Sequence, residues 1–165
     1  MALPRLLADP HFHTWRDAAA NPNLGSIAEV IPTYTGGDFA TEWAAAIAAV
    51  PAAAGCRLAA AVHVETVVGQ TEGGAVLDTC AETAWVVPQL AALPRDLGGH
   101  RLVAYVHLAR PDAGAVLARH RALAGAAFVG VRMVLNYDAA DASITWPQVD
   151  RGDYLTGGVP AFRDG

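Results

Sequence analysis

The sequence contains no lysine, and all eleven of its basic residues are arginine. A Schiff-base lysine and a lysine-derived metal bridge are therefore excluded within these residues. Sixteen acidic residues give a net charge of −5. That balance argues against nucleic acid or an acidic membrane surface as the main partner, because both require clustered positive charge.

Cysteine is scarce, and long apolar runs are absent. Cys56 and Cys80 have a spacing that suggests neither a disulfide framework nor a zinc site, so we predict two reduced, buried thiols. The first residues, MALPRLLADPHFH, lack the apolar stretch of a signal peptide. Elsewhere Gly, Pro or a charge interrupts every apolar run before the roughly 18 residues of a membrane span. We therefore expect a cytoplasmic protein.

Aromatic residues make up only 7% of the chain, so Ala, Val and Leu must fill most of the core. Four short apolar runs predict strands, at 6–13, 58–65, 101–109 and 128–135. The last three are rich in Val and apolar on both faces. Such runs are typical of parallel strands that are covered on both sides.

Helical patterns separate these runs. The stretch 38–54 is rich in Ala, and 79–93 opens with the capping-box pattern Thr79-Cys80-Ala81-Glu82. Pro88 is expected to kink or break this second helix. A third helix is predicted from Pro111 to about Leu123, with Gly125 capping its end.

The alternation of strands and helices predicts an α/β fold with a parallel sheet and right-handed crossovers. Four strands are about half of a (β/α)₈ barrel, which typically needs about 250 residues. An open, doubly wound sheet is the alternative fold that fits the composition. No glycine-rich turn follows a strand, so nothing in the sequence supports an open sheet that binds a nucleotide.

The segment that carries chemistry lies at the end of the first strand. Asp9, His11 and His13 stand two residues apart, so the period of a strand places all three on one face. Two imidazoles at this spacing can bind one divalent cation. Catalytic zinc needs a third protein ligand, which must come from elsewhere.

This first motif, Asp9-Pro10-His11-Phe12-His13-Thr14-Trp15, resembles the first-strand signature of the amidohydrolase-related family, the branch with lactonases and decarboxylases. The resemblance continues over most of the chain. It includes His63-Val64-Glu65, Glu82-Thr83-Ala84-Trp85, Gly130-Val131-Arg132 and Arg151-Gly152-Asp153-Tyr154-Leu155, the last of which resembles the loop before strand five.

The resemblance implies a barrel hydrolase that acts on a lactone or a related ester or amide, or alternatively a decarboxylase. His11 and His13 would bind zinc or manganese, or polarise the substrate in a metal-free member. Asp9 would orient a neighbouring group, or be a buried carboxylate bonded to the backbone. Arg132 could bind a substrate carboxylate through two parallel hydrogen bonds, or pair with a nearby Asp or Glu.

Other polar and aromatic residues indicate a functional role less specifically. His63 and Glu65 share strand parity and could face the barrel interior, although a hydrogen-bonded core histidine is the commoner role for His63. Trp15 could form a wall of the substrate pocket or pack structurally. We expect His107 in the core.

His100 and His120 occur among arginines, so we expect both to face solvent.

The family's remaining active-site groups follow strands five, six and eight, which the sequence does not reach. We therefore expect residues 1–165 to form half of a barrel, with 138–165 mostly loop. Half a barrel leaves two strand edges and an apolar interior exposed. Such a unit would be inactive alone, serve as a binding or structural module, or complete itself as a homodimer.

Overall fold

The computed structural model describes residues 5–16, 32–50, 55–66, 71–72, 75–76, 78–94, 99–135, 137–141 and 152–154. Most of the tail predicted as loop lies outside these residues. The parts of the tail that are described, 138–141 and 152–154, contain neither helix nor strand.

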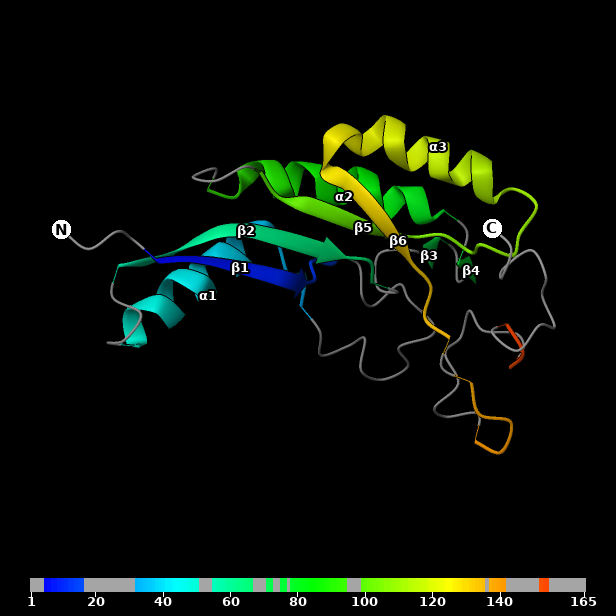
Figure 1. Ribbon diagram of the computed structural model, residues 1–165, viewed down its shortest axis with the longest axis horizontal. Helices are drawn as coiled ribbons and strands as arrows, with labels where there is room; N and C mark the ends of the chain where they lie inside the picture. Colours follow the sequence, from blue (N-terminus) through cyan, green and yellow to red (C-terminus); the bar gives the residue numbers. More distant parts are fainter. Residues whose placement is uncertain are drawn as a thin grey trace.

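Four strands form one parallel sheet, in the order β1-β2-β5-β6 (Figure 1). They span β1 Arg5–Phe12, β2 Cys56–Val64, β5 Arg101–Tyr105 and β6 Phe128–Arg132. All four predicted strands are confirmed, although β5 and β6 end earlier than their apolar runs do. The sequence did not predict the small antiparallel pair of β3 Thr71–Glu72 and β4 Ala75–Val76.

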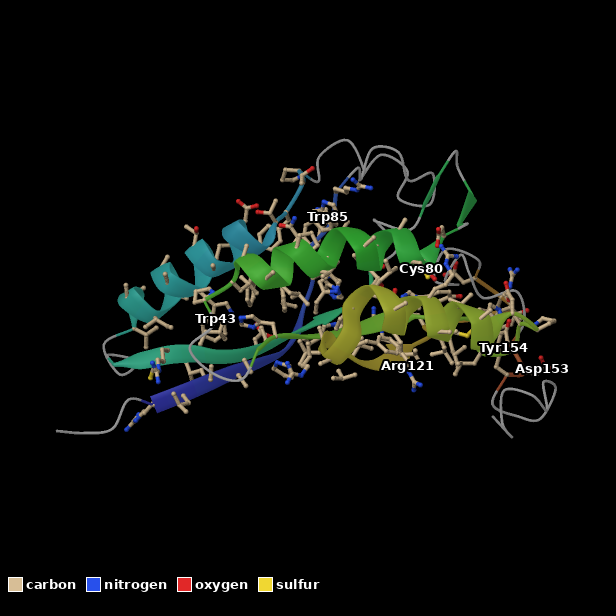
Figure 2. All side chains as sticks on the ribbon, turned by 90° about the horizontal axis from the view of Figure 1, so that it is seen from above. Trp43, Cys80, Trp85, Arg121, Asp153 and Tyr154 are labelled. Atoms are coloured by element: carbon tan, nitrogen blue, oxygen red, sulfur yellow. The ribbon has the colours of Figure 1, made fainter. Side chains whose placement is uncertain are left out.

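Three helices pack along one face of the sheet (Figure 2). They are α1 Gly36–Ala49, α2 Thr79–Ala92 and α3 Ala113–Ala124. Pro88 lies inside α2 without dividing it, so the predicted break is wrong. Gly125 ends α3 with a φ of 52°, a conformation that glycine adopts without strain, as predicted. Among the described residues, no helix is long and apolar enough to cross a membrane.

The capping box occurs at a different helix from the predicted one. At α2 the N-cap is Asp78, whose carboxylate accepts from the Cys80 N–H at 2.9 Å, so Thr79 is already inside the helix. The reciprocal box forms at α1, between Thr35 and Asp38. Asp78 takes precedence because its short carboxylate is one of the best N-cap groups.

One row of side chains crosses the sheet beneath the helices. Strand pairing aligns Phe12 with His63, His63 with Leu102, and Leu102 with Phe128. Phe12 and Leu102 belong to the core cluster formed with α1 and α2, and Phe128 stacks on His120 of α3. In-register neighbours of a parallel sheet share a face, so this row marks the helix side.

Helices α1 and α2 lie close together at Gly36. A Cβ added there would lie 2.6 Å from the Gln89 carbonyl oxygen, whereas a Cβ on Gly37 would meet nothing nearer than Thr35 Oγ1 at 3.5 Å. We expect Gly36→Ala to lower the free energy of unfolding by about 1–3 kcal/mol, because the two backbones must separate. Gly37→Ala should be neutral or slightly stabilising, since alanine favours helix.

Urea denaturation of the two variants beside the parent protein would measure this difference. Equal stabilities for the two alanine variants would show that α1 and α2 are not in close backbone contact.

Candidate functional site

The first strand contains a bulge that separates Asp9 from the two histidines. Asp9 pairs with Ala61 and Phe12 with His63, so three steps along β1 match two along β2. Pro10 lies within this interval and has no N–H to donate to the ladder. The extra residue reverses the alternation of side chains.

The prediction that Asp9, His11 and His13 share a face is therefore wrong for Asp9. Its side chain lies on the helix side, where Oδ2 accepts from the Trp43 indole N–H at 3.2 Å. Oδ1 accepts from the His11 backbone N–H at 2.9 Å. Asp9 is thus hydrogen-bonded to the backbone and fixes the bulge that positions His11.

His11 and His13 do converge, with their Nε2 atoms 3.0 Å apart. His13 Nδ1 donates to the Val64 carbonyl at 2.8 Å, so Nε2 of the neutral ring carries a lone pair. Burial is the main cause that lowers the pKa of His13, and the charges of His11 and Arg132 act in the same direction. The lowered pKa favours the neutral ring, in which Nε2 faces His11.

This geometry suits two ligands of one divalent ion. Zinc–nitrogen distances are about 2.0–2.1 Å, so two Nε2 atoms 3.0 Å apart can reach the same ion. A histidine that binds metal usually donates its other ring N–H to a carbonyl or carboxylate, as His13 does. Within the described part of the chain, no group of three His, Cys, Asp or Glu side chains could complete the ligand set.

Arg132 and Glu65 meet beside the histidines. Arg132 Nε donates to Glu65 Oε1 at 2.6 Å, and Nη2 donates to the Glu65 carbonyl at 2.9 Å. The Glu65 side chain is 3% exposed and that of Arg132 is 33% exposed. The Nε–Nη2 edge of the guanidinium is therefore occupied by Glu65, as the ion-pair alternative predicted. The remaining nitrogen, Nη1, lies 3.5 Å from His11 Nε2.

These four residues come from three strands and meet at the carboxyl-terminal edge of the sheet. Val64 pairs with Val103, and each lies one position beyond the row beneath the helices. Tyr105 lies three positions beyond Leu102 of that row and pairs with Arg132. Strand alternation therefore places Arg132 on the face opposite the helices. We call His11, His13, Glu65 and Arg132 the edge cluster.

His63 is not part of the edge cluster: it is a buried, hydrogen-bonded core histidine, the commoner of its two predicted roles. It belongs to the row beneath the helices, fully buried, with its ring edge-on to Phe12 at 5.6 Å. Nε2 donates to the Thr14 carbonyl at 3.3 Å. Among the described residues, neither His63 Nδ1 nor Thr14 Oγ1 has a hydrogen-bond partner. Burial lowers the pKa of His63 to about 3.

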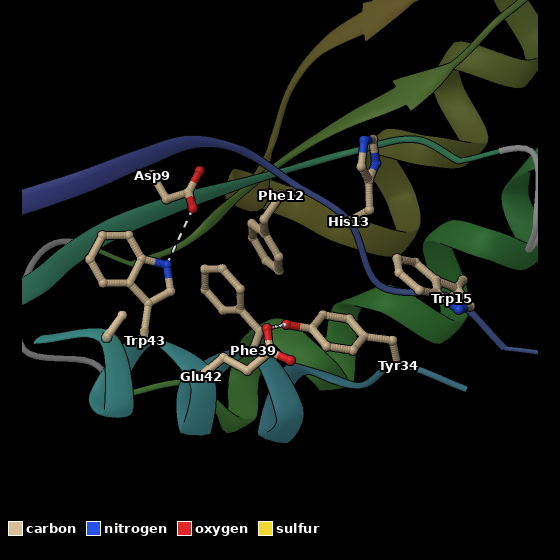
Figure 3. Close-up of a pocket in the computed structure, with 9 residues that line it drawn as sticks. Asp9, Phe12, His13, Trp15, Tyr34, Phe39, Glu42 and Trp43 are labelled. Atoms are coloured by element: carbon tan, nitrogen blue, oxygen red, sulfur yellow. Dashed lines mark hydrogen bonds between the residues drawn. The ribbon is translucent and has the colours of Figure 1, made fainter. Parts of the chain in front are cut away.

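Trp15 is not a member of the edge cluster and stacks on Tyr34 at 5.0 Å. It lines an open groove of about 610 Å³ between β1 and α1 (Figure 3). Figure 3 shows the His13 ring turned away from the aromatic side chains of this groove. Trp15 therefore does form the wall of a pocket, but not the same pocket as Glu65.

The other histidines differ from expectation. His120 is fully buried rather than solvent-facing: its Nε2 donates to the Tyr105 carbonyl at 3.2 Å, and Nδ1 accepts from Thr83 at 2.8 Å. His100 is also buried and donates to the Pro94 carbonyl. His107 is half-buried against Tyr154 rather than in the core. Tertiary contacts that no local pattern encodes decide all three positions.

The two cysteines are free thiols, as expected, with Cys80 buried and Cys56 half-buried. The chain matches no protein-family model, no curated protein and no solved structure.

Proposed function

We propose that this chain is the first half of a (β/α)₈-barrel hydrolase of the amidohydrolase-related type, acting on a small-molecule lactone or a related ester or amide. The observation that carries the proposal is the edge cluster. Two histidines with convergent nitrogens and an Arg–Glu pair gather where the strands of a parallel sheet end. In barrel enzymes the active site is built at this end of the strands.

The sheet supports the barrel. Its parallel strands lie side by side in chain order, apart from the small β3–β4 pair, and its helices cover one face. The opposite face would become the barrel interior, and the edge cluster lies on it. Closing such a barrel takes four more strands, either from a further segment or from a second copy of this chain in a homodimer.

His11 and His13 are the proposed metal ligands, and Asp9 and the Val64 carbonyl fix their orientation. A bound zinc or manganese ion would acidify a water molecule and polarise the substrate carbonyl. Arg132 and Glu65 tie the ends of β2 and β6 together beside this pair, and Nη1 of Arg132 is the donor left for substrate.

The test is hydrolysis of a panel of lactones, esters and amides by the purified protein with added zinc or manganese. His13→Ala should abolish metal-dependent hydrolysis and weaken Co²⁺ binding, followed by its visible absorption. The loss of affinity should exceed the roughly 10–100-fold that loss of a supporting hydrogen bond costs.

His100→Gln is the matched control, since His100 precedes β5 at the opposite edge of the sheet. Hydrolysis that is unaffected by His13→Ala, or impaired equally by His100→Gln, would contradict the proposed roles.

A second candidate is a half-barrel binding module without chemistry. It is favoured by the ligand set, because the described residues offer two convergent histidines and no group of three side chains that could hold one metal ion. Stoichiometric Co²⁺ binding with no hydrolysis of any class in the panel would support this candidate over the hydrolase.

A further inference from the structure

The groove between β1 and α1 is a second site beside the edge cluster, and His13 belongs to both. It lies on the helix side of β1, whereas His11 and Arg132 lie on the opposite face. Its volume of about 610 Å³ is in the range of small-molecule pockets. Its walls come from the end of β1 and the residues that follow, from Tyr34, and from one face of α1 (Figure 3).

Aromatic rings form most of these walls. Phe12 stacks on Phe39 with ring centroids 4.0 Å apart, and Trp15 stacks on Tyr34 at 5.0 Å. Trp43 closes the other end, with its ring edge-on to Phe39 at 6.4 Å. The indole nitrogens already have partners, because Trp43 donates to Asp9 and Trp15 donates to the Pro32 carbonyl. The rings are thus held in place.

The charge inside the groove is negative. Asp9 and Glu42 line it, and among its described lining residues there is no arginine. Glu42 Oε2 accepts from the Tyr34 hydroxyl at 2.6 Å. Burial raises the pKa of Tyr34, and this hydrogen bond and the charges of Glu42, Asp38 and Asp9 raise it further. Among the described residues, the charged groups that raise the pKa of this hydroxyl are carboxylates.

We propose that the groove binds an organic cation that carries a substituted ammonium group. Aromatic faces attract such a cation through their quadrupoles, most strongly when it lies within about 6 Å of the ring centroid. The carboxylates of Asp9 and Glu42 balance its charge, whereas an anion would meet uncompensated repulsion. A bare metal ion is a poor fit, because both Asp9 oxygens already accept hydrogen bonds and aromatic carbons are not ligands.

The test follows the indole N–H signals of Trp15 and Trp43 by NMR during titration of the full chain with choline. Ethanolamine, a primary ammonium, and the neutral carbon analogue of choline are titrated in parallel. Saturable shifts with choline or ethanolamine, and at least about five-fold weaker binding of the neutral analogue, are expected. The ammonium probe that binds more tightly shows whether the groove prefers a quaternary or a primary ammonium group.

Two variants locate the site. Glu42→Gln, at an exposed position that folding tolerates, and Trp43→Leu should each weaken choline binding by about three- to five-fold. Asp112→Asn and Trp85→Leu are the matched controls, since neither residue lines the groove, and both should bind as the parent does.

Equal affinity for the neutral analogue, or the absence of saturable indole shifts, would overturn the proposal. Since neither metal nor substrate is added, this result is independent of whether the edge cluster hydrolyses anything.

Discussion

Arg132→Met is expected to lower the free energy of unfolding by about 3 kcal/mol, the largest effect of any single change in the edge cluster. Glu65 is 3% exposed and receives two hydrogen bonds from this guanidinium. Removing one partner of a buried pair costs about 3–5 kcal/mol, because a carboxylate stays buried without its counter-charge. The lower end of this range applies because Arg132 is one-third exposed.

The Arg110–Asp112 pair provides a matched control on the surface. Its side chains are 64% and 52% exposed, so Arg110→Met should cost less than about 1 kcal/mol. The double variant Glu65→Gln/Arg132→Met should recover part of the loss, because no buried charge remains. Urea denaturation of all four proteins measures these differences. If Arg132→Met costs no more than Arg110→Met, the pair does not join β2 to β6.

Arg132→Lys tests whether geometry as well as charge matters. A lysine ammonium cannot reproduce the fork that contacts both the side chain and the backbone of Glu65. The free energy of unfolding of Arg132→Lys should therefore fall between that of the parent protein and that of Arg132→Met.

The strands and helices were predictable because their patterns are local. Apolar runs, three of them rich in Val, predicted the four parallel strands, and the glycine after an apolar stretch predicted the end of α3. The capping box was misplaced because two acceptors compete at α2, and the aspartate one residue earlier forms the cap.

The candidate site was predictable only in part. Strand alternation correctly brought His11 beside His13, but the same rule misplaced Asp9. One bulge at Pro10 is enough to reverse alternation, and sequence does not show on which strand a bulge falls. The Arg132–Glu65 contact joins residues 67 positions apart, so it depends on the sheet order.

The aromatic groove could not be predicted from local sequence patterns either. Trp43 fits an ordinary apolar stripe of an amphipathic helix, and Trp15 a structural aromatic after a strand. Only the packing of α1 on β1 brings these rings together with Asp9 and Glu42.

The second large effect is expected in acid. The pKa of His63 is about 3 in the folded protein, far below its ordinary value of 6.5. Between these values the unfolded chain binds a proton that the folded protein does not, so stability rises with pH across this window. The stabilisation is therefore complete above about pH 6.5 and is lost as the pH falls toward 3. At 1.36 kcal/mol per pH unit, lowering the pH from 7 to 4 should cost about 3 kcal/mol through His63 alone.

His63→Gln isolates this contribution. Glutamine has no proton to gain in this range and can still donate to the Thr14 carbonyl, so the stability difference between pH 7 and pH 4 should shrink by about 3 kcal/mol. Phe12→Leu is the comparison, because it removes the ring that contacts His63 but no titrating group. It should lower stability equally at both pH values. Carboxylates such as Asp78, whose pKa is also lowered, contribute an acid slope of the same sign to every variant. If the pH dependence of His63→Gln equals that of Phe12→Leu, the buried ring is not kept neutral by the fold.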